Sequence, residues 1–211
     1  MISPERLELM QQTWVRQLAR FEVAPGDAYP PFDDLVARYQ EPHRYYHNLE
    51  HIGEVLKVIA KLSDLANDPG SLFLAAWYHD AIYDPRAKDN EARSAELAVA
   101  HLTPLGLARE RLDKITALIL ATSHTQSTST ETDICILLDA DLAILGAEEK
   151  RYRRYAEDIR REYAWVDAEA YRVGRSAVLE GFLKRERIYR TDRMFAEGEE
   201  AARYNLRTEL S

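Results

Sequence analysis

Apolar residues recur along this chain at the spacing of amphipathic helices. One such stripe repeats at intervals of three and four residues: Ile52, Val55, Ile59 and Leu62. Asn48 stands just before this stripe, and asparagine caps helix N-termini well. No segment shows the convincing apolar–polar alternation of a β-strand. The pattern therefore predicts an all-α fold.

Prolines, glycines and polar clusters divide the chain into about eight to ten predicted helices. The proline-dense residues 24–32 and the Ser/Thr-rich residues 125–131 are predicted to be loops. Residues 132–145 are apolar on almost every side, which indicates a central, buried helix that Gly146 closes. The predicted helices cover about residues 4–21, 32–39, 48–62, 71–83, 90–102, 108–122, 132–145, 147–163, 167–185 and 191–211.

The length and composition of the chain favour a single domain that covers residues 1–211. The chain is 46% hydrophobic, which is enough for a sizeable core. Its net charge of −8 disfavours a nucleic-acid polymer or an anionic membrane as a partner. The single cysteine, Cys135, excludes a disulfide framework. Apolar runs are shorter than a membrane span and the first residues lack a signal-peptide pattern, so we expect a cytoplasmic location.

Four side chains bring metal-binding chemistry into otherwise apolar surroundings. The doublet His79-Asp80 follows an apolar run, where a buried carboxylate is costly without a cation or hydrogen bonds. His51 lies four residues before Val55, on the apolar stripe, and Asp141 interrupts the central predicted helix. Any one of these groups alone is more simply explained as a hydrogen-bonded core residue. Together, two imidazoles and two carboxylates on three apolar stripes favour a metal centre.

This donor set suits Mn, Fe, Co, Ni, Zn or Mg, with positions left for water. The fourth ligand has an alternative, because Asp139 lies in the same predicted helix as Asp141, two residues away. The two aspartates lie on different faces of that helix. Since the helix is apolar on all sides, periodicity alone does not separate them.

The order His51, His79-Asp80, Asp141 resembles the HD superfamily of metal-dependent phosphohydrolases. In that superfamily a His, a His-Asp doublet and a distant Asp on a buried helix follow one another along the chain. The similarity spans about residues 47–145, and the ordered set is more specific than the doublet alone. The similar segments are residues 51–55, 78–84, 91–98, 115–124 and 138–142. A narrower bacterial group of predicted HD phosphohydrolases is similar at residues 46–51, 138–146 and 155–165.

The resemblance implies an HD-domain-like helical bundle with extra N- and C-terminal helices. Its core would cover about residues 43–146, and a helical extension would cover about residues 147–211. The family pattern favours Asp141 over Asp139, so Asp139 is expected to be a supporting or structural carboxylate. The implied ligands of the divalent metal ion are His51, His79, Asp80 and Asp141.

The resemblance also implies hydrolysis of a phosphomonoester or phosphodiester. Asp84 or Glu91 would orient or deprotonate the attacking water, although each is also an ordinary acid near a helix end. His124 would bind phosphate, protonate the leaving group or join a second metal, unless it simply ends its helix. Alarmone hydrolases of the superfamily carry a Glu-Asp pair where this chain has Tyr83-Asp84. That difference argues against alarmone hydrolysis and leaves the water-activating group open.

A small phosphorylated substrate needs cations and binding surfaces. His47, four residues before His51, would line the cavity or buttress the helix start. The 12 tyrosines fit a nucleotide-like substrate without establishing one. The candidate cations for phosphate are Arg44, Lys88, Arg154, Arg160 and Arg175.

Two rival hypotheses remain beside the enzyme. The chain could be an HD-type module that binds a metal or nucleotide without turnover. It could also be a structural helical protein with a hydrogen-bonded polar centre, forming a homodimer through its Arg/Glu-rich C-terminal helices. Metal content separates the structural hypothesis from the other two. Loss of turnover in Asp80→Asn separates the enzyme from the binding module.

Overall fold

The computed structural model of this chain describes residues 2–123 and 129–211, and these residues contain no strand. They form ten α-helices and one short 3-10 helix, η1, which confirms the all-α prediction. No helix in these two ranges has both the length and the apolar character needed to cross a bilayer. The elements are α1 (Pro4–Ala19), α2 (Pro25–Tyr39), α3 (Leu49–Lys61), α4 (Pro69–Tyr78), α5 (Asn90–Leu102), α6 (Arg109–Ala121), α7 (Thr132–Asp141), η1 (Leu142–Gly146), α8 (Glu149–Glu162), α9 (Ala168–Leu183) and α10 (Asp192–Leu210).

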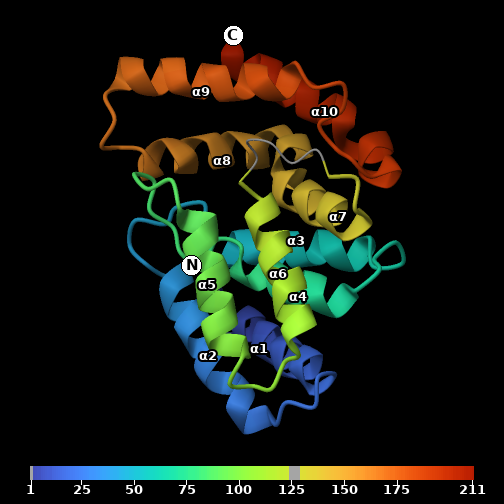
Figure 1. The fold of residues 1–211 in the computed structure, drawn as a ribbon. Helices are drawn as coiled ribbons and strands as arrows, with labels where there is room; N and C mark the ends of the chain where they lie inside the picture. Colours follow the sequence, from blue (N-terminus) through green and yellow to red (C-terminus); the bar gives the residue numbers. More distant parts are fainter. Residues whose placement is uncertain (1, 124–128) are drawn as a thin grey trace.

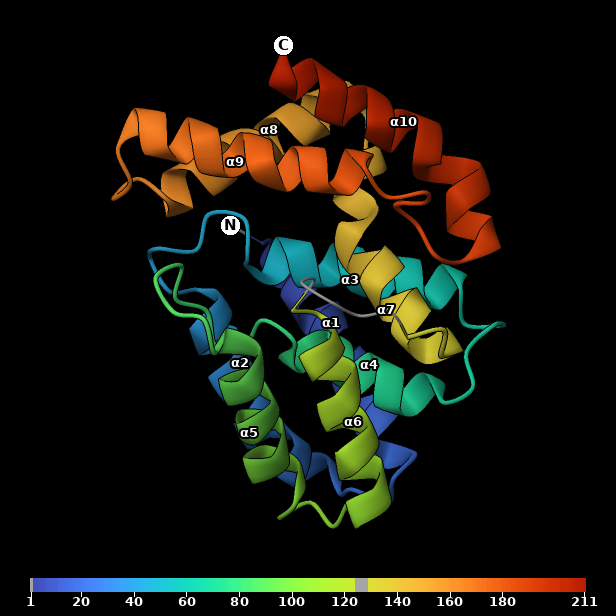
Figure 2. The same ribbon diagram turned by 45° about the horizontal axis from the view of Figure 1, so that its top comes forward.

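The helices fall into two groups with a layer between them. Helices α8, α9 and α10 gather on one side, and α1, α2, α5 and α6 lie on the other (Figure 1 and Figure 2). Helix α3 lies between the groups and packs against α4 and α7, while α10 packs on η1 and α9. One cluster of buried hydrophobic residues extends from Met10 in α1 to Leu206 in α10.

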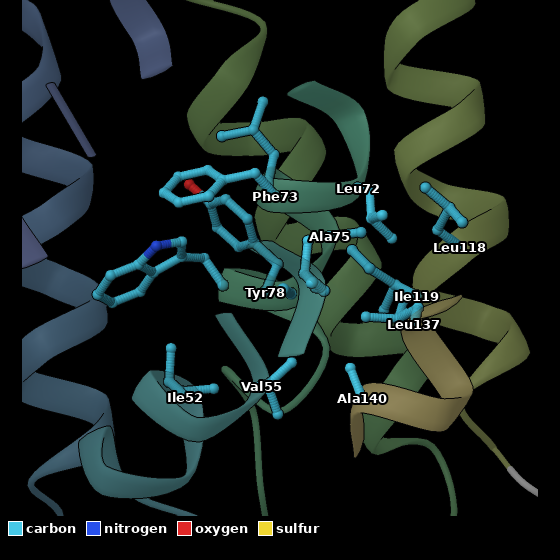
Figure 3. Packing of buried hydrophobic residues seen from close by; sticks show 14 of the residues in the cluster. Ile52, Val55, Leu72, Phe73, Ala75, Tyr78, Leu118, Ile119, Leu137 and Ala140 are labelled. Carbon is cyan, nitrogen blue, oxygen red and sulfur yellow. The ribbon is translucent and has the colours of Figure 1, made fainter. Parts of the chain in front are cut away.

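Helix α4 runs through the core, because every one of residues 70–78 is buried. Helix α7 is also buried along most of its length, as its apolar sequence predicted. Figure 3 shows side chains of α3, α4, α6 and α7 that meet in this interior. Those that it labels are Ile52, Val55, Leu72, Phe73, Ala75, Tyr78, Leu118, Ile119, Leu137 and Ala140.

The prediction of a loop at residues 24–32 is wrong, because these residues open α2. Pro25 occupies the first turn, where its missing N–H costs nothing, but two further prolines lie inside the helix. Tertiary packing compensates for them: Phe32 is buried against Trp14, with ring centroids 6.3 Å apart. The Trp14 indole also donates to the Ala28 carbonyl at 2.8 Å. Burial of this face outweighs the helix-breaking tendency of proline, which is about 3 kcal/mol per residue.

Two helices end earlier than predicted, and both ends carry candidate ligands. Helix α4 stops at Tyr78 rather than near residue 83, so His79 is its C-cap and Asp80 lies beyond it. Helix α7 stops at Asp141, and the chain continues to Gly146 as η1. Successive helical residues point about 100° apart. The helix ends at this doublet, and the side chains of His79 and Asp80 nevertheless approach one point.

Candidate metal centre

Three segments far apart in the sequence bring four metal-binding side chains together. His51 comes from the first turn of α3, which Asn48 caps by accepting from the Glu50 amide at 2.8 Å. The other three groups follow or end α4 and α7. One donor atom from each group lies within 4.8 Å of the others, and the four groups are His51, His79, Asp80 and Asp141.

The spacing of these donor atoms fits a metal ion. His79 Nε2 lies 3.1 Å from Asp80 Oδ2 and 3.3 Å from His51 Nε2. His51 Nε2 lies 3.3 Å from Asp141 Oδ1, and two further imidazole–carboxylate pairs are 3.5 Å apart. Ligands about 2.1 Å from a tetrahedral zinc-type ion are separated by about 3.4 Å. Two nitrogens and two oxygens at these distances could therefore hold one divalent ion.

Contacts outside the cluster fix how its groups are presented. The Nδ1 of His79 lies 2.9 Å from the Ala76 carbonyl, an acceptor, so this nitrogen carries the proton and donates it. Nε2 then offers its lone pair to the centre. Arg44 donates to the Asp80 carbonyl at 2.6 Å and to the Ala81 carbonyl at 2.9 Å. These two hydrogen bonds from Arg44 fix the backbone at Asp80.

Burial and charge oppose each other at this centre. Only 2% of His51 and 1% of His79 is exposed, and burial disfavours their charged forms. Hydrogen bonds to Asp141 and Asp80 outweigh burial and raise the pKa of His51. Against the same burial, Asp80 raises the pKa of His79 well above its usual value, and His79 lowers the pKa of Asp80 well below its own. These interactions favour the protonated imidazoles, so a metal would have to compete with protons for their nitrogens.

The two aspartates of α7 have different surroundings. Asp139 is fully buried and accepts from the backbone amides of Arg190 and Thr191, at 2.7 and 2.8 Å. The Thr191 hydroxyl also donates to it, at 2.7 Å. Asp141, two residues further, belongs to the metal-binding group. Asp139 therefore joins α7 to the start of α10, while Asp141 faces the two imidazoles.

A cleft of about 550 Å³ opens beside the centre, and Asp80 and Asp141 are among its lining residues. Four of the residues that the sequence suggested for catalysis or substrate binding line it as well: His47, Lys88, Glu91 and Arg175. Aromatic rings form much of the rest of its wall: Tyr46, Tyr83, Tyr155 and Tyr163. The cleft thus combines carboxylates, cations and aromatic surface next to the candidate ligands.

Four other suggested residues lie outside this cleft. Asp84 is exposed, and its side chain accepts from the Arg86 amide at 2.9 Å, which closes the turn after α4. Arg44 donates to the backbone carbonyls of Asp80 and Ala81, as described above. Arg154 pairs with Glu50 at 2.8 Å beside a separate hollow.

Arg160 is occupied by the turn between α8 and α9, where it donates to backbone carbonyls. These placements do not favour roles for the four residues in the cleft. His124, the suggested phosphate or proton ligand, lies outside the described residues.

Glu162 is a buried acid that the sequence interpretation missed. Its Oε1 accepts from the amides of Tyr45, Tyr46 and His47 at 2.7–3.0 Å. Its Oε2 lies 2.6 Å from His47 Nδ1 and accepts from the Tyr83 hydroxyl at 2.9 Å. Burial would raise its pKa, but the charge and hydrogen bonds of His47 lower the pKa of Glu162 to about 2.

The signal for Glu162 was present in the sequence. It lies three residues after Ile159 and seven after Tyr155, on the buried face of α8. The same interruption of an apolar face had identified Asp141. The structure also marks Tyr46 as a candidate functional residue, which the sequence could not show. Its buried hydroxyl has no hydrogen-bond partner among the described residues.

The chain matches none of the protein-family models, curated proteins or solved structures with which it was compared. The case for a metal centre therefore rests on the four donor groups and their geometry. The resemblance to the HD superfamily rests on the sequence motifs alone.

Proposed function

We propose that this protein is a metal-dependent phosphohydrolase that acts on a phosphomonoester or phosphodiester. The observation that carries the proposal is the convergence of two imidazoles and two carboxylates within 4.8 Å beside a cleft. Such mixed nitrogen and oxygen ligands suit a divalent ion such as Mn, Fe, Co, Ni, Zn or Mg. Lys88 and Arg175 add positive charge to the same cleft, as a phosphate requires. The resemblance to the HD superfamily supports the same class of reaction.

The side chains of the cleft have separable roles in this proposal. A divalent ion held by the four ligands would supply Lewis acidity toward a phosphoryl oxygen and lower the pKa of a water ligand. Lys88 and Arg175 would orient the phosphate. Glu91 is the one carboxylate, besides Asp80 and Asp141, among the described residues that line the cleft. It is therefore our candidate to orient the attacking water and accept its proton.

His47 is placed to act at the other end of the reacting bond. Glu162 holds its Nδ1, which leaves Nε2 for the cleft that His47 lines. The ring also stacks on Tyr83, with centroids 4.1 Å apart. When both of its nitrogens are protonated, a ring fixed on two sides can donate a hydrogen bond from Nε2 to a phosphoryl or leaving-group oxygen in one orientation. The Tyr46 hydroxyl, which has no hydrogen-bond partner in residues 2–123 and 129–211, is a further donor for a bound ligand.

A binding module without turnover is the second candidate, and the position of Asp84 favours it. In the turn after α4 this acid caps the Arg86 amide and does not line the cleft. One of the two suggested water-activating groups is thereby removed. If Glu91 does not replace it, the centre would bind a metal and a phosphate without cleaving the ester.

The test is phosphate release from a panel of monoesters and diesters, with Mn, Co, Ni, Zn or Mg added in turn. We expect metal-dependent turnover in the wild type and in Asp113→Asn, which changes an exposed acid on α6. Asp80→Asn should abolish turnover, and Glu91→Gln should reduce it by about 100-fold or more. Metal and phosphate binding without release from any ester would establish the binding module instead.

A further inference from the structure

A second hollow adjoins the cleft where the α8–α9 connection meets α9. Its volume is about 410 Å³, within the range of about 300–1,000 Å³ that is usual for small-molecule sites. Aliphatic and aromatic side chains dominate its lining, among them Val166 and Tyr171. Three lining residues also line the metal cleft: Tyr163, Arg175 and Val178. The two hollows therefore adjoin each other and share part of their wall.

The wall of this hollow is held in place by Arg160. Its guanidinium donates to the carbonyls of Tyr163 and Val166 at 2.7 and 3.1 Å, which closes the turn after α8. The same group lies over the ring of Tyr171, 4.5 Å from its centroid. Contacts from one cation to three lining residues make the hollow a preformed surface, with no rearrangement needed to open it.

Gly174 keeps one side of the hollow open. It lies inside α9, where glycine is less stable than alanine, so its presence there costs helix stability. A Cβ added at Gly174 would meet no atom within 4 Å. Gly181, seven residues or about two turns further along α9, has equally open surroundings but does not line the hollow. The two glycines therefore make a matched pair for substitution.

We propose that the hollow is a subsite for the organic group of the phosphate ester, and that this group is apolar or aromatic. The inference rests on the proposed function, since it places the phosphate at the metal end of the cleft. Arg175 lies where the two hollows meet, and Glu209 and Tyr155 hold its guanidinium at 2.8 and 3.2 Å. An occupant would cover Val178, which is 51% exposed.

The size of the effect follows from the surface that the occupant buries. About 60 Å² of apolar surface removed from water corresponds to about tenfold in affinity. A bicyclic aromatic group can bury at least that much against Val166, Tyr171 and Val178. A polar group such as glycerol would gain little, because aliphatic and aromatic side chains dominate this wall.

The experiment measures binding separately from turnover. Calorimetry with Mn²⁺ present would compare two phosphonates whose P–C bond is not hydrolysed, 1-naphthylmethylphosphonate and 2-hydroxyethylphosphonate, with adenosine monophosphate as a third ligand. We expect the naphthyl compound to bind the wild type about tenfold or more tightly than the hydroxyethyl compound. Gly174→Phe should remove that preference, and Gly181→Phe should retain it. Thermal melting of both variants would verify that they fold.

Each other outcome has a definite meaning. Equal affinity of the two phosphonates, or equal effects of the two glycine variants, would overturn the subsite. If adenosine monophosphate bound more tightly than the naphthyl compound, and Gly174→Phe did not change this, the polar base would bind outside the hollow. A change of oligomeric state in Gly174→Phe without loss of the preference would assign the hollow to a second copy of this chain. A naphthyl preference without hydrolysis of any ester would keep the subsite and refute the phosphohydrolase.

Discussion

At the scale of single residues, three buried carboxylates differ from the two half-buried carboxylates of the candidate metal centre. Asp133, Asp139 and Glu162 each accept at least two backbone amide hydrogens, and these bonds compensate for their burial. Asp80 and Asp141 instead meet the imidazoles of the candidate metal centre. These three acids are thus satisfied largely by the backbone, while the acids of the centre face imidazoles with which they could share a metal ion.

Glu162→Gln should lower the free energy of unfolding at pH 7 by roughly 1–3 kcal/mol, because Oε2 receives hydrogen bonds from His47 and Tyr83. The folded-state pKa of Glu162, about 2, lies below its usual 4.5. Its contribution is therefore complete above pH 4.5 and is lost as the pH falls toward 2. Urea unfolding at several pH values would measure this. A constant difference at every pH, or an equal loss in the exposed Glu180→Gln, would contradict the account.

Metal binding should release protons at pH 7. Against their burial, Asp80 and Asp141 raise the pKa of both histidines of the centre, so protons compete with a metal for these nitrogens. A metal ligand must be deprotonated, so affinity should fall as the pH is lowered. Calorimetry in buffers of different ionisation enthalpy would count the protons. Binding at pH 7 with no proton released would contradict the assignment of His51 and His79.

At the scale of elements, the site is built where helices begin and end. His51 stands in the first turn of α3, His79 caps α4, and Asp141 is the last residue of α7. Side chains at helix ends can point in directions that the 3.6-residue repeat does not set. Hydrogen bonds also fix these ends: Asn48 caps the start of α3, and Asp139 joins the end of α7 to residues 190–191.

The two aspartates of α7 should respond to substitution in opposite ways. Asp139 accepts from the Arg190 amide through Oδ1 and from the Thr191 amide through Oδ2. Asp139→Asn replaces one of these two oxygens, so we expect a loss of roughly 1–3 kcal/mol in stability with metal binding retained. Asp141→Asn keeps a polar side chain beside the two imidazoles, so we expect a smaller loss of stability. Its loss of metal affinity should exceed the roughly 10–100-fold that an outer hydrogen bond is worth. Urea unfolding and metal titration of both variants would decide, and the reverse result would make Asp139 the ligand.

Most of this arrangement could be predicted from the sequence, and the predictions that failed did so for physical reasons. His51 was found because it lies on an apolar stripe, and the cap at Asn48 set the phase of that stripe. Asp139 and Asp141 could not be separated by periodicity, because contacts from residues 190–191 decide between them. The first half of α2, residues 25–31, was missed because its prolines are compensated only by packing on Trp14. Glu162 was overlooked although it interrupts the apolar face of α8.

At the scale of the whole molecule, the C-terminal helices cover the segment that carries Asp141. Helix α10 packs on η1, and Asn205 donates to the carbonyls of Leu145 and Ala147, at 2.8 Å each. Helices α8 and α9 supply one wall of the cleft, including Tyr155 and Arg175. The last third of the chain therefore both supports the centre and shapes its opening.

Removing the Asn205 amide should separate these two effects. Asn205→Ala leaves two carbonyls without their donor, so we expect a loss of roughly 1–3 kcal/mol in unfolding free energy. Metal should still stabilise this variant by as much as it stabilises the wild type, about 2.7 kcal/mol at 100 times the dissociation constant. Thermal melting with and without metal would measure both. If metal no longer stabilised this variant, α10 would be needed to form the centre.

The most direct test of the account is elemental analysis of protein purified without chelators, for the wild type and Asp80→Asn. The four converging groups predict close to one divalent or transition metal ion per chain in the wild type, and almost none in the variant. Asp139→Asn, folded but less stable, should retain the metal. A wild type that stays empty after Mn, Co, Ni, Zn and Mg are offered would contradict the metal centre. His51, His79, Asp80 and Asp141 would then be a buried network joined by protons.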